Sequence, residues 1–141
     1  VSVGEVLVVA GAVLRGDRIL LAQRDYPEAV AGLWELPGGK VETGESPAAA
    51  LVRELCEELD VVVSVGASLR DVVRPRDGLT LVAMRAEIVS GTPRAVEHRA
   101  IRWVDAEGLT ALMAAGKVVP NDRGWAQEMV AELRLRPHAP S

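Results

Sequence analysis

Three glutamates near the middle of the chain, Glu54, Glu57 and Glu58, could do chemistry together. Their spacing of i, i+3 and i+4 places all three carboxylates on one face of a helix. Like charges at this spacing repel by roughly 0.2 to 0.5 kcal/mol per pair, so a compensating positive charge is expected. Oxygen ligands at this density suit a hard divalent cation, Mg²⁺ or Mn²⁺, which keeps several water ligands and bridges to phosphate groups. A solvated, glutamate-rich helix face is the alternative interpretation.

The helix that would carry these glutamates is predicted from its start and from its apolar side. Ser46 can cap free N–H groups, and Pro47 is tolerated at the first helical position. On a helical wheel the leucines of this segment fall on the side opposite the glutamates. We therefore expect an amphipathic helix over residues 47–59.

Strands are expected on both sides of this helix, because β-branched and leucine-rich runs alternate with glycine- and proline-rich turns. Trp34 to Leu36 should form a short strand before a sharp turn at residues 37–39. Asp105 can cap a helix over residues 106–115, and residues 120–122 can start a last helix that reaches about residue 135. Strands with a few helices around one sheet predict an α/β layered domain. The longer strands are expected over residues 5–14, 18–24, 61–65, 68–74, 79–89 and 100–104.

The length, charge and hydropathy of the chain limit the classes of protein to which it can belong. A chain of 141 residues, 49% hydrophobic and 26% charged, fits a single folded domain. Its 16 basic and 20 acidic side chains give a net charge of −4, which disfavours binding to long nucleic acid. No run approaches the roughly 20 apolar residues of a membrane helix, so no membrane partner is expected. The single Cys56, without a secretion signal, predicts a cytoplasmic protein.

The spacing around the three glutamates also resembles a known motif. The order is Gly39, five residues, Glu45, seven residues, Arg53-Glu54-Leu55, one residue, Glu57-Glu58, and it is similar to the box of the Nudix hydrolases. Residues 22–24, 33–40 and 97–103 also look like the MutT-type nucleoside triphosphate pyrophosphohydrolases of that family. One departure is Asp60, where the family pattern has glycine just past the helix end. A left-handed conformation there would cost aspartate up to about 1 kcal/mol.

The resemblance implies a fold and a domain layout. The expected fold is the Nudix α/β/α sandwich with a mixed central sheet, in which a loop-helix-loop box binds the catalytic metals. One such domain would cover residues 1–135, and residues 136–141 are expected to form a flexible tail.

By resemblance, the metal ligands come from the box and from a distant loop. For Arg53, an ion pair with Glu45 that fixes the box loop is favoured over a direct catalytic role. Glu97 could instead be a solvated loop residue, and its neighbour His98 fits a surface histidine better than a ligand. The implied catalytic residues are Arg53, Glu54, Glu57 and Glu58, with Glu54 as a further ligand or the general base, and the implied metal ligands are the Gly38 carbonyl, Glu54, Glu57, Glu58 and Glu97.

The resemblance also implies substrate contacts. Arg24 and Lys40 would meet phosphates, and Glu35 and Leu36 lie beside the nucleoside. Asp122 falls where MutT-type enzymes read the base. An ionised carboxylate only accepts hydrogen bonds, so it suits the N4 amino group of cytosine and repels O6 of guanine. Capping of the last helix is the other interpretation of Asp122.

These features predict a function. The expected reaction is Mg²⁺-dependent hydrolysis of (deoxy)nucleoside triphosphates to the monophosphate and pyrophosphate, with CTP, dCTP and 5-methyl-dCTP favoured and Mn²⁺ as a substitute. 8-oxo-dGTP is the alternative substrate, because a protonated Asp122 could accommodate a base whose N7 carries a hydrogen. A non-hydrolytic nucleotide-sensing domain is less expected, since all three box glutamates are present. The protein should act on its small nucleotide as a monomer or a homodimer, in nucleotide-pool sanitation or housekeeping.

Overall fold

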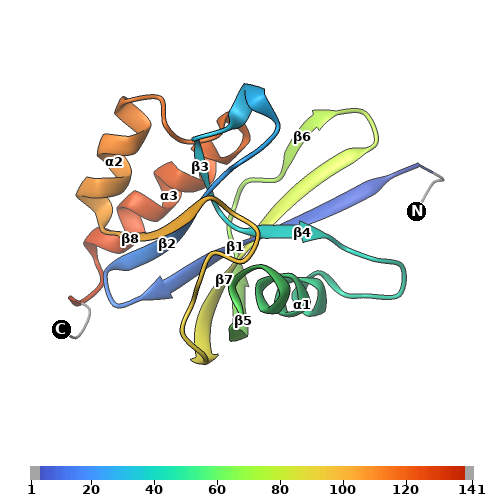
Figure 1. Cartoon of the computed structure of the whole chain (residues 1–141), viewed down its shortest axis with the longest axis horizontal. Helices are drawn as coiled ribbons and strands as arrows, with labels where there is room; N and C mark the ends of the chain where they lie inside the picture. Colours follow the sequence, from blue (N-terminus) through green and yellow to red (C-terminus); the bar gives the residue numbers. More distant parts are fainter. Residues whose placement is uncertain (1–3, 139–141) are drawn as a thin grey trace.

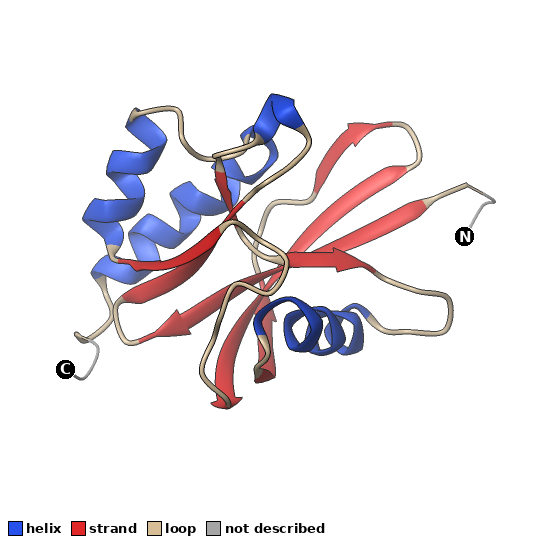
Figure 2. Ribbon diagram, viewed as in Figure 1, coloured by secondary structure: helices blue, strands red, loops and turns tan. Residues whose placement is uncertain are grey.

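An eight-stranded mixed sheet lies between helices on its two faces (Figure 1). The structure is a computed structural model, and it describes residues 4–138. Figure 2 shows the strands gathered at the centre and the helices outside them. The strands are β1 (Val6–Arg15), β2 (Arg18–Gln23), β3 (Trp34–Glu35), β4 (Gly38–Lys40), β5 (Val62–Ser68), β6 (Val73–Arg76), β7 (Leu79–Ser90) and β8 (Ala100–Val104). The helices are α1 (Pro47–Leu59), α2 (Ala106–Ala114) and α3 (Arg123–Arg134), with 3-10 turns at Glu28–Val30 and Pro120–Asp122.

The sheet is mixed because its central strand has neighbours of both directions. The order is β3-β2-β1-β7-β5, with β4 paired to β1, β6 to β7 and β8 to β2. β1 runs parallel to β7 over eight residue pairs and antiparallel to β2 and β4. This arrangement confirms the predicted α/β/α sandwich with a mixed central sheet.

The two faces of the sheet bury two separate apolar clusters. On one face, Leu51, Leu55 and Leu59 of α1 are fully buried among side chains of β1, β2 and β5. On the other face, α2 and α3 pack together, and Trp125 and Met129 of α3 are buried there. The leucine side of α1 therefore fixes the helix on the sheet and turns its glutamates toward the neighbouring loops.

Local signals define both ends of α1. Ser46 accepts a hydrogen bond from the N–H of Ala49 at 3.1 Å, and Pro47 occupies the first turn. Asp60 ends the helix with φ 59° and ψ 42°, the left-handed conformation predicted for it. The helix therefore has the bounds that the sequence predicted.

The sequence predicted a sharp turn at residues 37–39, but the structure places part of this segment in a strand. Gly38 and Gly39 belong to β4, which pairs with Val9 and Ala10 of β1. A Cβ atom at Gly38 would overlap the carbonyl oxygen of Val9, so only glycine allows the two backbones to approach this closely. The expected strand over residues 68–74 is also interrupted, because β5 ends at Ser68 after a register shift and β6 begins at Val73.

The C-terminal residues that the structure describes contact the turn between β1 and β2. Arg136 Nε donates to the Gly16 carbonyl at 2.6 Å, and His138 Nδ1 lies 2.8 Å from Asp17 Oδ2. Residues 139–141 of the expected tail lie outside the described residues. Within residues 4–138, none of the helices has both the length and the apolar character that crossing a membrane requires.

Candidate active site

Arg53 connects α1 to the box loop, the segment of residues 41–46 between β4 and α1, through several hydrogen bonds. Its Nε and Nη2 donate to the two oxygens of Glu45 at 2.7 and 2.9 Å, and Nη2 also donates to the Lys40 carbonyl at 3.0 Å. The hydrogen bonds from Arg53 lower the pKa of Glu45 to about 2, and those to Glu45 and Glu54 raise the pKa of Arg53. The predicted ion pair is confirmed, and it fixes the loop to the helix.

The same arginine orients the first glutamate of the helix. Arg53 Nη1 donates to Glu54 Oε1 at 2.9 Å. A Cβ atom at Gly39 would overlap the Glu54 carboxylate, so the glycine of β4 leaves the space that this side chain occupies. Glu54 is therefore held from one side by Arg53 and packed from the other against β4.

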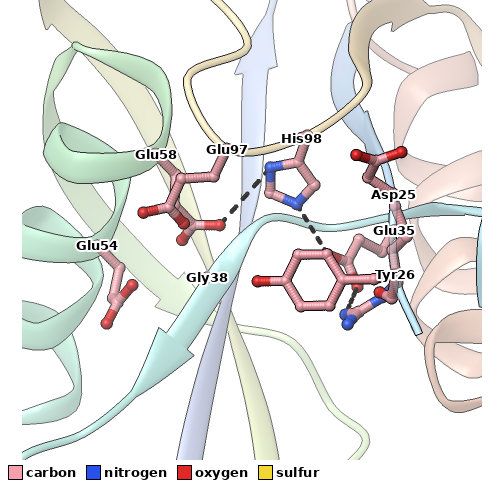
Figure 3. A pocket seen from close by; sticks show the side chains of 9 residues that line it. Asp25, Tyr26, Glu35, Gly38, Glu54, Glu58, Glu97 and His98 are labelled. Carbon is pink, nitrogen blue, oxygen red and sulfur yellow. Dashed lines mark hydrogen bonds and ion pairs between the residues drawn. The ribbon is translucent and has the colours of Figure 1, made fainter.

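A polar pocket of about 190 Å³ opens beside Glu54 (Figure 3). Glu54 and Glu58 reach it from α1, Gly38 from β4, and Glu97 and His98 from the loop before β8. Glu57 is not among its lining residues, because its half-exposed carboxylate lies 3.5 Å from Arg53 Nη1. The remaining lining residues are Arg24, Asp25, Tyr26 and Glu35.

Glu58 is buried in this acidic surrounding. Burial raises the pKa of its carboxyl to about 9, and the negative charges of Glu54, Glu97 and Glu35 act in the same direction. Its Oε2 atom has no hydrogen-bond partner within residues 4–138. A divalent cation would satisfy this buried oxygen and neutralise the surrounding charge, so the donor set fits a hard metal ion.

The protein groups alone do not form a closed metal site. Within the described part of the chain, no three side chains of Asp, Glu, His or Cys lie close enough together to hold an ion. Mg²⁺ characteristically uses one or two carboxylates and completes its coordination with waters and substrate phosphates. The pocket therefore fits a metal that a few carboxylates hold and whose coordination waters and substrate phosphates complete.

The sequence predicted a surface position for His98, and this prediction is wrong. Its side chain is only 9% exposed, and it lies between Glu35 and Glu58 in the polar pocket (Figure 3). The imidazole reaches this position because its loop contacts both α1 and β2, which are distant in the sequence. No local pattern around His98 indicates this burial.

A second cavity, of about 560 Å³, adjoins the polar pocket. Arg24, Glu35 and Gly38 line both spaces. The larger cavity lies between the β1–β4 pair and the segment of residues 119–122. Leu36 contributes to its wall, and the exposed Lys40 lies at its edge. Its volume is in the range of pockets that bind small ligands.

Asp122 lies at the wall of this cavity and is 7% exposed. Asp122 occupies the N-cap position of α3, but its side chain makes no capping hydrogen bond, so the interpretation of this carboxylate as a helix cap is wrong. Its Oδ2 atom instead accepts a hydrogen bond from the Leu36 N–H at 2.8 Å. Burial raises the pKa of Asp122 to about 7. The hydrogen bond from the Leu36 N–H and the positive charge of Arg24 lower this pKa, whereas the negative charge of Glu35 raises it.

Arg24 and Glu35 form a pair between the two spaces. Arg24 Nη1 donates to Glu35 Oε1 at 3.0 Å, and Arg24 Nε donates to the Tyr26 carbonyl at 3.1 Å. The structure thus brings together all of the predicted substrate residues around the larger cavity: Arg24, Glu35, Leu36, Lys40 and Asp122.

An α/β/α sandwich with carboxylates of one helix beside a nucleoside-sized cavity defines a class of nucleotide hydrolases. The NUDIX domain model matches residues 6–129, and the chain belongs to the Nudix hydrolase family. Members of this family generally need a divalent metal ion.

Named relatives and a solved structure agree with this family. The chain is similar to "Putative 8-oxo-dGTP diphosphatase 2" of Mycobacterium tuberculosis, with 45% identity over 130 residues, 90% of this chain and 89% of the relative. It is also similar to CTP pyrophosphohydrolase of Escherichia coli, with 44% identity over 102 residues, 71% of this chain and 76% of the relative. The solution structure of the E. coli ORF135 protein superimposes with a TM-score of 0.73 at 36% identity, covering 92% of this chain and 91% of that one.

Replacing Gly39 by alanine should lower the turnover number for nucleotide hydrolysis about 100-fold, because the added Cβ atom displaces the Glu54 carboxylate. Steady-state hydrolysis measures the effect, and the melting temperature shows whether the fold persists. Gly66→Ala in β5 is the matched control, because a Cβ there meets only ordinary contacts at 3.7 Å. Wild-type turnover in Gly39→Ala would contradict the role given to Glu54.

Proposed function

We propose that this protein hydrolyses nucleoside triphosphates to the monophosphate and pyrophosphate with Mg²⁺. The observation that carries the proposal is the adjacency of two spaces. A carboxylate-lined pocket suits a metal and a phosphate chain, and the cavity that shares Arg24, Glu35 and Gly38 with it has the size for a nucleoside. A triphosphate placed across both would bring its phosphates to α1 and its base to Asp122.

The metal would be held mainly by carboxylates of α1. We assign Glu58, Glu54, Glu97 and the Gly38 carbonyl as its ligands, because these groups line the polar pocket. Glu57 would join this set once its carboxylate turns away from Arg53. A divalent metal bound there neutralises phosphate charge and lowers the pKa of a coordinated water.

The remaining steps fall to groups of the protein itself. Glu54, oriented by Arg53, would take the proton of the attacking water as a general base. Arg53 bonds to Glu45 and Glu54, so it acts as a positioning residue. Arg24 and Lys40, at the junction and the edge of the cavity, supply positive charge for the phosphates.

Asp122 supports a preference for cytosine nucleotides. Because its Oδ2 atom is bonded to Leu36, its other oxygen is available to the base. When ionised, that oxygen accepts a hydrogen bond from the N4 amino group of cytosine and repels O6 of guanine. The similarity of this chain to a relative named CTP pyrophosphohydrolase supports the same substrate class.

8-oxo-dGTP is the second candidate substrate, and the same residue favours it. With a pKa of about 7, Asp122 is protonated in a large fraction of molecules at neutral pH. A protonated carboxyl can donate to O6 of the purine. The relative whose name includes 8-oxo-dGTP diphosphatase supports this alternative.

Steady-state hydrolysis of CTP, dCTP, 5-methyl-dCTP, dGTP and 8-oxo-dGTP with Mg²⁺, with pyrophosphate and phosphate measured separately, tests the proposal. We expect pyrophosphate to be released fastest from the cytosine nucleotides. Faster release from 8-oxo-dGTP would support the proposed reaction but contradict the proposed preference for cytosine. If the protein hydrolysed none of these compounds, the proposed reaction would be overturned and a nucleotide-sensing domain would be favoured.

A further inference from the structure

The imidazole of His98 contacts two carboxylates that belong to different parts of the site. Its Nε2 lies 2.9 Å from Glu35 Oε2, and its Nδ1 faces Glu58 Oε1 at 3.7 Å. A carboxylate only accepts hydrogen bonds, so Nε2 is the donor toward Glu35. Figure 3 shows the ring between the two side chains, with a dashed line to each. The ring thus fills the space between the substrate side and the metal side of the pocket.

The loop of residues 91–99 holds His98 from both directions. On one side, the N–H groups of Arg94 and Val96 donate to the carbonyls of Leu59 and Glu58 at the end of α1. On the other side, the Arg99 N–H donates to the Gln23 carbonyl at the end of β2. His98 therefore lies between two anchored points of its backbone.

The contacts of His98 continue on the substrate side. The second oxygen of Glu35 accepts the hydrogen bond from Arg24, so Arg24, Glu35, His98 and Glu58 form a continuous series of polar contacts. The side chains of Glu35, His98 and Glu58 are each at most 15% exposed. Buried polar groups in such series restrict one another's orientation, because each has few alternative partners.

We propose that His98 is a positioning residue that couples the orientation of Glu35 to that of Glu58. This inference rests on the proposed function, in which Glu58 binds the metal and Arg24 and Glu35 face the substrate. Glu58 Oε1 faces the ring at 3.7 Å, and Glu58 Oε2 and His98 Nδ1 are buried without a hydrogen-bond partner in the described chain, so the ring borders the space in which the Glu58 carboxylate can turn. His98 then has two separable effects, one through each ring nitrogen.

Three substitutions of His98 test this coupling. His98→Ala removes both contacts, and we expect Mn²⁺ affinity and kcat/KM to fall 10- to 100-fold, the range for partners of metal ligands. In His98→Gln the amide reaches the place of Nε2, so KM should stay near the wild-type value while Mn²⁺ affinity stays low. In His98→Asn the amide reaches only the place of Nδ1, so Mn²⁺ affinity should recover while KM rises.

Mn²⁺ binding to the full chain, measured by electron paramagnetic resonance without nucleotide, gives a readout independent of turnover. The melting temperature of each variant accompanies it. His138→Gln is the matched control, since this histidine contacts Asp17 and neither residue lines the two cavities. A role limited to packing would lower the melting temperature in all three variants and would not separate Gln from Asn.

Two results would overturn the inference. One is wild-type Mn²⁺ affinity in His98→Ala, and the other is the same change of KM and affinity in the Gln and Asn variants. Failure of the wild-type protein to hydrolyse any triphosphate would instead overturn the proposed function. In that case the Mn²⁺ affinities of the variants would still decide whether His98 positions Glu58.

Discussion

Glu58→Gln should lower kcat for triphosphate hydrolysis about 1000-fold and weaken Mn²⁺ binding while the protein remains folded. A metal held at this site contributes several kcal/mol of charge stabilisation in the transition state, and about 4 kcal/mol corresponds to three powers of ten in rate. Glutamine keeps the shape of the side chain but cannot supply the negative charge that Glu58, the most buried carboxylate in the polar pocket, would carry when it binds the metal. Turnover and Mn²⁺ titration measure the two effects.

The same variant should change how stability depends on pH. Folding raises the pKa of Glu58 from 4.5 to about 9, so between these values the metal-free folded protein binds a proton that the unfolded chain has lost. This contribution to the free energy of unfolding is complete below pH 4.5 and is lost as the pH rises toward 9. The melting temperature of the metal-free wild type should therefore decrease between pH 6 and pH 9, and Glu58→Gln should decrease less.

Glu107→Gln is the matched control for Glu58. This glutamate is 77% exposed in α2 and pairs with Arg134, away from both cavities. It should keep wild-type kcat, Mn²⁺ affinity and pH dependence. If Glu58→Gln retained wild-type Mn²⁺ affinity, the assignment of this carboxylate to the metal would be wrong.

The acidic helix could be predicted from sequence because its signals are local. Ser46 and Pro47 mark its start, the leucine spacing marks its buried side, and Asp60 adopts the left-handed conformation that the family pattern expects at its end. The pairing of Arg53 with Glu45 also follows from the box spacing, since only Ser46 and residues 47–52 of α1 separate them. These features depend on residues within one continuous segment.

The parts that sequence did not reveal depend on contacts between distant segments. β4 is a strand only because Gly38 and Gly39 lie against β1. His98 is buried because its loop contacts both α1 and β2. From the sequence, Asp122 could be interpreted as a helix cap or as a base reader. In the structure its carboxylate accepts from the N–H of Leu36, 86 positions earlier, and makes no capping hydrogen bond. Periodicity and capping rules describe neighbours along the chain, so they cannot supply such contacts.

The base preference of this enzyme should depend on pH and on Asp122. With a pKa of about 7, Asp122 changes from mostly protonated at pH 6 to mostly ionised at pH 8. The ionised form accepts from cytosine N4, and only the protonated form can donate to guanine O6. The ratio of kcat/KM for dCTP to that for dGTP follows the ratio of ionised to protonated Asp122, so it should rise about 100-fold over this range. Both substrates carry the same triphosphate, so its own ionisation cancels in the ratio.

Asp122→Asn should remove this pH dependence and shift the ratio toward guanine about 10- to 100-fold. The Leu36 N–H donates to Oδ2, so the asparagine must turn its carbonyl oxygen to Leu36 and its amino group to the base. That amino group donates to guanine O6 at every pH and meets the N4 amino group of cytosine without an acceptor. Asp105→Asn is the control, because Asp105 caps α2 outside both cavities and should leave the ratio unchanged. An unchanged ratio in Asp122→Asn would show that another group reads the base.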